Sequence, residues 1–364
     1  MTKTIDHFHS ALKTELDLTQ NYIISFSEVK DRLTRKSIGH IVKNRGKMLR
    51  PILLILSGWY SYRISNEDNQ NDTLFIDDIA KAAAILELIQ MSSLIHDDVL
   101  DHASVRRNKA TLNHLKGNRF AILIGDYLVA QSLKNCYQLV HNVDRLFDSV
   151  ILYSFLENIS KLVLGEVQQN NFNESPHRNK NGIDKYFEIV ENKTASLFSL
   201  ACFVGSTIGS DNPKNSDLLK QFGHNIGIAY QIIDDLRDFA TTKEISGEKN
   251  FQDIKFGIKT LPIILAFQAS QNGGSEKLLT YFNSKKELSR KEKIEITDIL
   301  TGTKSIEKSF QNVQTHIINA KTILNQLPEN KYSILLSEFV SFLNETSEKV
   351  VNDIINLKRE QIKL

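Results

Sequence analysis

Residues 79–101 read IAKAAAILELIQMSSLIHDDVLD, and this stretch indicates the fold class. It contains neither glycine nor proline, and its apolar residues cover most of the circumference of a helix. At 1.5 Å per residue the helix is roughly 35 Å long. Because a helix that is apolar all round belongs in the interior of a protein, we expect this one to be central.

The rest of the chain is equally poor in residues that interrupt helices, with five prolines and 16 glycines among 364 residues. Long stretches without either residue favour helices over many short strands. We find no internal repeat and no linker, so the sequence predicts one all-α domain spanning residues 1–364. Further helices are predicted at about 8–36, 118–140, 144–170, 184–209, 215–240 and 259–271, with three or four more in the C-terminal third.

Three polar features interrupt or begin these helices. Asp77 and Asp78 suit a helix start, because carboxylates are favourable near a helix N-terminus. Residues 171–182 and 240–257 are predicted loops. Loops longer than about 12–15 residues are uncommon unless they serve a function, so the second is a candidate element of a site.

The composition excludes several classes of protein. Hydrophobic residues make up 41% and charged residues 24%, which is typical of a globular protein, and a net charge of +2 does not favour nucleic-acid binding. Two cysteines without paired spacing, Cys136 and Cys202, favour a reducing compartment over a disulfide framework or a zinc site. The first residues, MTKTIDHFHS, lack the apolar core of a signal peptide, and no apolar run approaches the ~20 residues that span a bilayer. We therefore expect a cytoplasmic protein.

The end of the apolar stretch carries three carboxylates, Asp97, Asp98 and Asp101. On a helix Asp97 and Asp101 lie within about 40° of one another, one turn apart. Three carboxylates at one end of an apolar helix repel each other unless a cation compensates them. Oxygen ligands of this kind suit Mg²⁺, although a single acidic cluster is more often a solvated helix end.

The same D-D-x-x-D pattern recurs at the end of another apolar run, as Asp234, Asp235 and Asp238 in YQIIDDLRDF. One copy is weak evidence for a metal site, whereas two copies that both end helical runs are strong evidence. Basic residues occur within reach of the two motifs or in neighbouring segments. They are Lys47, Arg50, Arg106, Arg107, Lys193, Lys249 and Lys259. Together these groups indicate a site for a diphosphate, held by metal ions and by direct cationic contacts.

Here the sequence resembles the trans-isoprenyl diphosphate synthases, also called polyprenyl synthetases. The resemblance runs from about residue 40 to residue 270 and is weaker beyond. Its landmarks are G-K-x-x-R-P at 46–51, DDVLDHASVRR at 97–107, GDYL at 125–128, GEVQ at 165–168, KTASLF at 193–198, GHNIGIAYQIIDDLRDF at 223–239 and TLP at 260–262.

The resemblance implies an all-α bundle around a deep central cavity, a homodimer, and a prenyltransferase that joins isopentenyl diphosphate head-to-tail to an allylic diphosphate. It implies two or three Mg²⁺ ions held by Asp97, Asp98, Asp101, Asp234, Asp235 and Asp238. The allylic diphosphate would contact Arg106, Lys193, Thr194, Gln231, Lys249 and Lys259. Isopentenyl diphosphate would contact Lys47, Arg50, Gln90 and Arg107. The membrane would be touched at most peripherally, for product release.

Two positions depart from the family pattern. Asn108 follows the arginine pair where the family usually has glycine. In GIKTLP, Ile258 occupies the place of the usual lysine and Lys259 comes one residue later. Whether Lys259 takes over the contact to the diphosphate is the open question at this end of the site.

Product length should depend on the residues just before Asp97. Ser92 and Ser93 are small there, whereas aromatic residues near this place stop growth at fifteen carbons in the family. We therefore expect a product of twenty carbons or more, with a long chain of about thirty to fifty favoured over geranylgeranyl diphosphate. The alternative is that the serines only permit close helix packing. His96 is expected to be a packing residue rather than a ligand.

Two other functions compete with this interpretation. A class I terpene cyclase shares the first motif, but its second motif has an Asn/Asp, Ser/Thr and Glu pattern, which differs from Asp234–Asp238. A catalytically silent partner subunit would be expected to lose carboxylates, and this chain keeps all six. Condensation by an active enzyme is therefore favoured.

Overall fold

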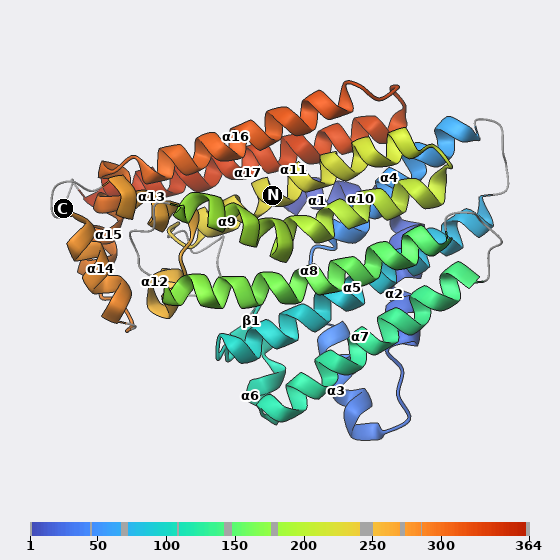
Figure 1. The fold of residues 1–364 in the computed structure, drawn as a ribbon, viewed down its shortest axis with the longest axis horizontal. Helices are drawn as coiled ribbons and strands as arrows, with labels where there is room; N and C mark the ends of the chain where they lie inside the picture. The colour runs from blue at the N-terminus through green and yellow to red at the C-terminus, as the bar shows by residue number, and fades with distance from the viewer. Residues whose placement is uncertain are drawn as a thin grey trace. The chain divides into compact units, whose positions relative to one another are not determined.

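The structure is a computed structural model. It describes residues 2–43, 46–66, 72–107, 109–141, 148–175, 181–240, 250–269, 274–284 and 286–361. Almost all of its elements are helices, and the strands in this part of the chain are two two-residue segments that pair antiparallel (Figure 1). The predicted all-α class is confirmed. None of the helices built from these residues combines the length and the apolar character needed to cross a membrane.

The chain divides into two compact units. Unit 1 comprises Met1–Leu162, Ser196–His224 and Ala320–Phe339, and unit 2 comprises Val163–Ala195, Asn225–Asn319 and Val340–Leu364. The predicted single domain stays a prediction. Four helices have residues in both units: α8 (Asp148–Glu174), α11 (Pro213–Arg237), α16 (Ser305–Leu324) and α17 (Lys331–Gln361).

Unit 1 is built around the helix that the apolar stretch predicts. This helix, α5, runs from Thr73 to Leu100, and it contacts α2, α4, α7 and α10 (Figure 1). Residues 82–89 of α5 are all buried, which explains why that stretch is apolar on every side except at Glu87. The other elements of the unit are α1 (Thr2–Ala11), α2 (Lys13–Phe26), α3 (Arg32–Val42), α4 (Leu49–Ser65), β1 (Val105–Arg106), β2 (Lys109–Ala110), α6 (Leu112–Lys116), α7 (Asn118–His141) and α10 (Ser196–Gly209).

Unit 2 contains the shorter helices of the second half of the chain. They are α9 (Gly182–Val190), the π-helix η1 (Glu191–Ala195), α12 (Gln252–Phe256), α13 (Leu261–Ala269), α14 (Gly274–Ser284) and α15 (Arg290–Gly302). The strongly apolar α13 contacts α9, α14 and α15. Phe239 and Phe251 meet edge to face beside the end of α11, at a centroid distance of 5.5 Å. The contacts of α13 place α9, α14 and α15 around one core.

Several predicted boundaries were wrong for local reasons. The helix predicted at 8–36 is three helices, because Asp31 accepts a hydrogen bond from the backbone N–H of Thr34 and starts α3 anew. The helix predicted to start at Asp77 begins four residues earlier. Asp77 instead accepts a hydrogen bond from the Tyr22 hydroxyl of α2 and pairs with Lys81.

The two predicted loops are also partly helical. α8 continues to Glu174, and residues 176–180 lie outside the described residues. Within 240–257 a short helix, α12, forms, and residues 241–249 lie outside the described residues. Both extra helical ends are held by a side chain from elsewhere in unit 2, which local sequence reasoning does not reveal.

α4 and α10 approach so closely in unit 1 that only glycine fits at their contact. A Cβ on Gly205 would lie 2.0 Å from the carbonyl oxygen of Leu54, and a Cβ on Gly209 would lie 2.3 Å from that of Gly58. These obstacles are backbone atoms, so they cannot rotate away.

We therefore expect Gly205→Ala to lower the free energy of unfolding by about 1–3 kcal/mol, as overpacking in a core does. Gly39→Ala is the matched control, because its added methyl group meets no atom within 4 Å in α3. The control should be neutral or stabilising by up to about 1 kcal/mol. Urea denaturation of both variants measures the difference, and equal midpoints would show that the helices separate freely.

Candidate active site

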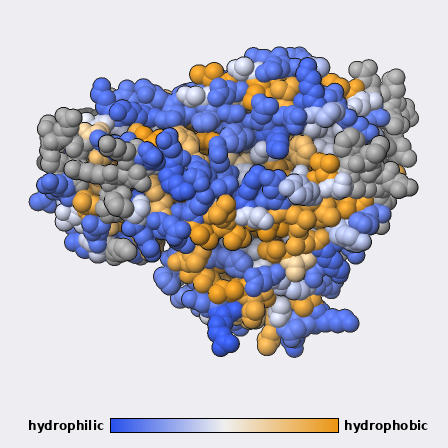
Figure 2. All heavy atoms as spheres, viewed as in Figure 1, coloured by the Kyte–Doolittle hydropathy of each residue, from blue (hydrophilic) through white to orange (hydrophobic). Residues whose placement is uncertain are grey.

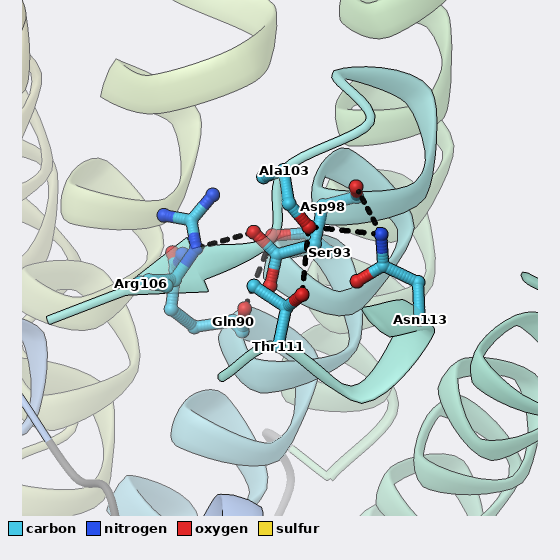
Figure 3. Close-up of polar contacts among 7 residues, drawn as sticks. All are labelled: Gln90, Ser93, Asp98, Ala103, Arg106, Thr111 and Asn113. Atoms are coloured by element: carbon cyan, nitrogen blue, oxygen red, sulfur yellow. Dashed lines mark hydrogen bonds and ion pairs between the residues drawn. The ribbon is translucent and has the colours of Figure 1, made fainter. Parts of the chain in front are cut away.

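The first acidic motif forms the end of α5. Asp97 and Asp98 lie in its last turn and Asp101 is its C-cap residue. Asp98 is buried, and its Oδ1 accepts a hydrogen bond of 2.6 Å from Nε of Arg106 (Figure 3). Burial and the neighbouring carboxylates of Asp97 and Asp101 raise the pKa of Asp98, and the Arg106 charge opposes them. One predicted cation, Arg106, therefore meets the predicted metal ligands directly.

The β1–β2 hairpin carries Arg106, and a set of hydrogen bonds ties its base to α5. The hydroxyl of Thr111 donates to the carbonyl of Ala103 at 2.6 Å. The Asn113 amide donates both to that carbonyl, at 3.0 Å, and to the carbonyl of Asp98, at 2.9 Å (Figure 3). These bonds fix the hairpin relative to the carboxylates.

The structure also brings together Arg107 and the segment 46–50, which were both predicted to bind isopentenyl diphosphate. Arg107 has a left-handed backbone with φ 52°, and its guanidinium packs against the Cα of Gly46, where a Cβ would lie 2.4 Å from Nη2. Lys47 follows Gly46, and the guanidinium carbon of Arg50 lies 4.4 Å from the ring centroid of Phe198. The glycine of G-K-x-x-R-P thus lets the flexible side chain of Arg107 pack directly on the backbone.

A buried acid near these arginines was missed. Glu87 lies on α5 three residues before Gln90 and is only 8% exposed. Burial raises its pKa to about 7, and the charges of Arg50 and Arg107 oppose the shift. The signal that could have identified it is a single carboxylate within the apolar run AAAILELI. A glutamate is rarely buried unless a group of opposite charge or a hydrogen-bond donor lies beside it, so its place in this run indicates a special role.

Because Glu87 is buried, its ionisation makes the free energy of unfolding depend on pH, and we expect Glu87→Gln to remove this dependence. A carboxyl whose pKa rises from 4.5 to about 7 on folding favours the native state below pH 4.5, and this advantage is lost as the pH rises through 7. Since glutamine stays neutral, the stability of the variant relative to wild type should increase by on the order of 3 kcal/mol between pH 4.5 and pH 8.

Urea denaturation over this pH range measures that difference. The exposed position Glu345 of α17 offers the control Glu345→Gln. A constant difference between Glu87→Gln and wild type across the range would contradict the expected ionisation of the buried group.

The second acidic motif ends α11 in unit 2, and its first two carboxylates differ sharply. Asp234 is exposed and pairs with Arg237 at 2.5 Å. Asp235 is 4% exposed, and burial raises its pKa to about 7. The hydroxyl of Tyr186 donates to Asp235 Oδ2 at 2.5 Å, and the amide of Gln231 donates to Oδ1 at 2.8 Å.

Asp238, the third member, caps a helix. Its two oxygens accept the backbone N–H groups of Gln252, at 3.0 Å, and Asp253, at 2.9 Å, at the start of α12. Burial raises its pKa to about 6 in spite of these bonds. The motif therefore organises the segment that follows the undescribed residues 241–249. Lys249, predicted to contact the allylic diphosphate, lies among those residues.

Among the described residues, no three His, Cys, Asp or Glu side chains are gathered closely enough to hold a metal ion. The donor sets of both motifs nevertheless fit a hard cation. Asp97 Oδ1 is buried without a hydrogen-bond partner in this part of the chain, and Asp235 is desolvated with neutral donors on both oxygens. Buried carboxylate oxygens of this kind suit Mg²⁺.

The π-helix η1 carries Lys193 and Thr194 and lies against α8. A Cβ on Gly165 would lie 2.8 Å from the backbone nitrogen of Lys193, so glycine is required at this contact. The ammonium group of Lys193 contacts Glu166 Oε1 at 2.7 Å and Gln169 Oε1 at 2.7 Å. The GEVQ segment is thus the surface that holds Lys193. π-Helices of this length often occur at functional sites.

A cavity of about 70 Å³ in unit 2 brings together five of the predicted residues. They are Lys193, Thr194, Gln231, Asp235 and Lys259. The hydroxyl of Thr194 donates to Gln231 Oε1 at 2.7 Å, which continues the hydrogen bonds from Gln231 to Asp235. Tyr186 also lines the cavity, and sequence reasoning did not identify it.

Lys259 lines the same cavity, but its ammonium group is used by the protein. It is 4% exposed and donates to the carbonyl oxygens of Phe172, at 2.6 Å, and Ser175, at 2.5 Å, and to the hydroxyl of Ser175, at 3.1 Å. Burial lowers its pKa to about 8. Since an ammonium has three donors, a diphosphate would have to displace one of these oxygens.

The two serines before the first motif face different surroundings. Ser92 is buried, and its hydroxyl donates to the carbonyl of Gly125 on α7 at 2.9 Å. Ser93 is half-buried and donates to the carbonyl of Gln90 in its own helix. His96 packs over Gly125, where a Cβ would lie 2.2 Å from Nε2, so the predicted packing role of His96 is supported.

Comparison with known proteins identifies the family. Residues 31–300 match the polyprenyl synthetase family. Heptaprenyl diphosphate synthase component 2 of Bacillus subtilis (strain 168) is 29% identical over 306 residues, which cover 84% of this chain and 80% of the relative. An all-trans-nonaprenyl-diphosphate synthase (geranyl-diphosphate specific) of Rhodobacter capsulatus is 31% identical over 232 residues, covering 64% of this chain and 65% of the relative.

Solved structures agree with the fold. A polyprenyl synthase from Caulobacter crescentus CB15, complexed with calcium and isoprenyl diphosphate, superposes with a TM-score of 0.80 at 23% identity. The match covers 93% of this chain and 97% of the other, and at this identity it supports the all-α fold alone. The family match rests on the sequence. Because it spans most of the chain, the protein belongs to the polyprenyl synthetase family of prenyltransferases.

Proposed function

We propose that this protein condenses isopentenyl diphosphate head-to-tail with an allylic diphosphate and releases an all-trans polyprenyl diphosphate. The observation that carries this proposal is the cavity of unit 2, where a cation, a hydroxyl, an amide and a buried carboxylate meet. Lys193, Thr194, Gln231 and Asp235 are the groups that the family motifs assign to the allylic diphosphate and its metal ions. The names of the Bacillus and Rhodobacter relatives describe the same class of reaction.

Each diphosphate has its own set of cations in the proposal. Lys193, with Arg106 and Lys249, would bind the allylic diphosphate, and Lys259 would join them only after releasing one of its present acceptors. Isopentenyl diphosphate would bind Lys47, Arg50, Gln90 and Arg107. The contact between Arg107 and Gly46 supports this second set, because it joins the two segments in unit 1.

The six motif aspartates would hold two or three Mg²⁺ ions per active site. The unpartnered Oδ1 of Asp97 supports a cation there, and the calcium in the Caulobacter structure shows that one relative of the same fold binds a divalent ion. When bound, Mg²⁺ supplies Lewis-acid neutralisation of the charge that develops on the departing diphosphate.

The side chains of the protein supply the remaining catalytic effects. Lys193 and the arginines offer preorganised positive charge to the leaving group, which lowers the cost of ionising the allylic carbon–oxygen bond. Holding the alkene of isopentenyl diphosphate beside that carbon makes the attack effectively intramolecular. The apolar walls, including Ile189 and Val190 of the cavity, exclude water that would trap the cation. The released pyrophosphate can accept the final proton, so the proposal needs no protein base.

We also propose a cytoplasmic homodimer. Exposed apolar side chains gather in unit 1 on α7 and on the first part of α8, where Figure 2 shows a cluster of hydrophobic residues. They are Ile122, Leu123, Tyr137, Val150, Tyr153 and Leu156. A patch of this kind typically marks a contact with another protein. Since the Bacillus relative is named as component 2 of its enzyme, an unlike partner is the competing occupant of this patch.

The decisive experiment is to incubate the purified single chain with labelled isopentenyl diphosphate, Mg²⁺ and a geranyl or farnesyl diphosphate primer. We expect label in extractable polyprenyl diphosphate. Asp97→Asn should lower kcat/KM by at least about 100-fold, since a metal ligand supplies several kcal/mol of transition-state stabilisation. Lys304→Gln, a change at a residue outside both motifs, is the control.

No incorporation by the wild-type chain with any primer would contradict the proposal and favour a silent subunit. Activity restored by a second, different chain would assign this protein to a two-component enzyme. Chromatography of the extracted product identifies its length in the same experiment.

For the product we propose a long chain, with geranylgeranyl diphosphate as the alternative. Small residues at positions 92 and 93 and the names of the heptaprenyl and nonaprenyl relatives support the longer product. The hydrogen bond from Ser92 to Gly125 favours a packing role for Ser92. The half-buried Ser93 has more room.

We therefore expect Ser93→Phe, and Ser92→Phe where that variant folds, to shorten the product by one or more isoprene units. The added ring would occupy space that the growing chain needs. Ser92→Ala is the control, because it removes the hydroxyl without adding volume and should leave product length unchanged. An unchanged product from a folded Ser93→Phe variant would place the length-setting wall on another helix.

A further inference from the structure

Tyr186 joins α9 to the second acidic motif. Its side chain is 4% exposed, and its hydroxyl donates a 2.5 Å hydrogen bond to Asp235 Oδ2 inside unit 2. The amide of Gln231, one turn before Asp235 on α11, donates to the other oxygen. The carboxylate therefore receives one donor from each of two helices, and its rotation is fixed on both sides.

The hydroxyl of Tyr186 is a donor at neutral pH, because a phenol loses its proton only at about pH 10. The backbone N–H of Leu261 donates to the same carboxylate. All three donors to Asp235 are uncharged, so none of them compensates its charge. A carboxylate has about four acceptor positions on its two oxygens, so about one remains for a cation after these bonds are made.

We propose that Tyr186 is a positioning residue that holds the Asp235 carboxylate in the orientation that binds Mg²⁺. This inference rests on the proposed function, and it assigns a role to a residue outside both acidic motifs. Partners that orient a metal ligand typically change metal affinity by 10–100-fold when they are removed. The bond from Tyr186 meets this description, because it is short, buried and directed at a carboxylate whose other donors are also neutral.

The competing explanation is that Tyr186 only ties α9 to α11. A structural tether would lower the stability of the protein by the same amount with and without Mg²⁺. A positioning role would instead change the Mg²⁺ concentration that the protein requires. The two explanations therefore differ in a quantity that can be measured without turnover.

The experiment compares Tyr186→Phe with wild type and with Tyr281→Phe. Tyr281 also donates to a carboxylate of unit 2, Glu295, but it does not line the cavity, so the control loses the same kind of bond elsewhere. The midpoint of thermal unfolding of each protein is followed as Mg²⁺ is added in the presence of inorganic pyrophosphate. We expect Tyr186→Phe to require about 10–100-fold more Mg²⁺ for half of the full shift, and Tyr281→Phe to match wild type.

A second variant, Tyr186→His, keeps a ring N–H donor and should need less Mg²⁺ than Tyr186→Phe. If the phenylalanine variant does not fold, the histidine variant provides the test. Its shorter side chain misplaces the donor, so we expect a Mg²⁺ requirement between those of wild type and Asp235→Asn. A requirement equal to that of wild type would then overturn the proposal. In a double variant with Asp235→Asn, the Tyr186→Phe change should have no further effect on the Mg²⁺ requirement, because its target carboxylate is gone.

A folded Tyr186→Phe variant with an unchanged Mg²⁺ requirement would overturn the proposal, as would failure of both Tyr186 variants to fold. The labelled isopentenyl diphosphate assay separates these results from failure of the proposed function. Wild-type chain that incorporates label while Tyr186→Phe keeps its Mg²⁺ requirement refutes only the role of Tyr186. A wild-type chain that neither incorporates label nor responds to Mg²⁺ and pyrophosphate refutes both.

Discussion

A carboxylate that leaves water must be compensated, and this constraint explains how the candidate site is built. Four acids of the site are buried or nearly so, and each is compensated differently. Asp98 has the guanidinium of Arg106, and Asp238 has two backbone N–H groups of α12. Asp235 has only neutral donors, and Glu87 has arginines near it. The pKa values of all four are nevertheless raised, so the compensation is incomplete at each acid.

The same constraint links the acids to the irregular parts of the backbone. The β1–β2 hairpin brings Arg106 to Asp98, and α12 begins where Asp238 accepts its free N–H groups. The β1–β2 hairpin and α12 are too short to be stable alone, and each forms where its groups hydrogen-bond to a buried carboxylate. These carboxylates are held in place, but their negative charge is only partly neutralised by the protein. Bound cations would neutralise the remainder.

The features that depend on local sequence patterns were predictable, whereas most of those that depend on contacts between distant segments were not. The central helix and both acidic motifs are local patterns, so the run at 79–101 and the repeated D-D-x-x-D identify them from sequence alone. Tyr186 and η1 depend on contacts between distant segments, whereas Glu87 had a local signal, a lone carboxylate in an apolar run. Nothing near Tyr186 in the sequence indicates that its hydroxyl meets Asp235, 49 residues later. The glycines at 46 and 165 were visible as motif letters, but the atoms that pack against them, in the Arg107 guanidinium and the Lys193 backbone, were not.

Lys259 shows how a shift of one residue can change the role of a side chain. Directly after Gly257, Ile258 occupies the place where the family has lysine, and the next residue turns its ammonium toward the end of α8. The carbonyl of Phe172 also accepts the N–H and the hydroxyl of Ser175, and a cation at this helix C-terminus is favourable. Lys259 therefore extends α8 beyond the predicted loop boundary and closes one side of the cavity that holds Lys193. In this chain the ammonium of Lys259 is held by oxygens of that wall. Under the proposed function the allylic diphosphate would therefore depend on the other cations of its set, and Lys193 among them would have to leave Glu166.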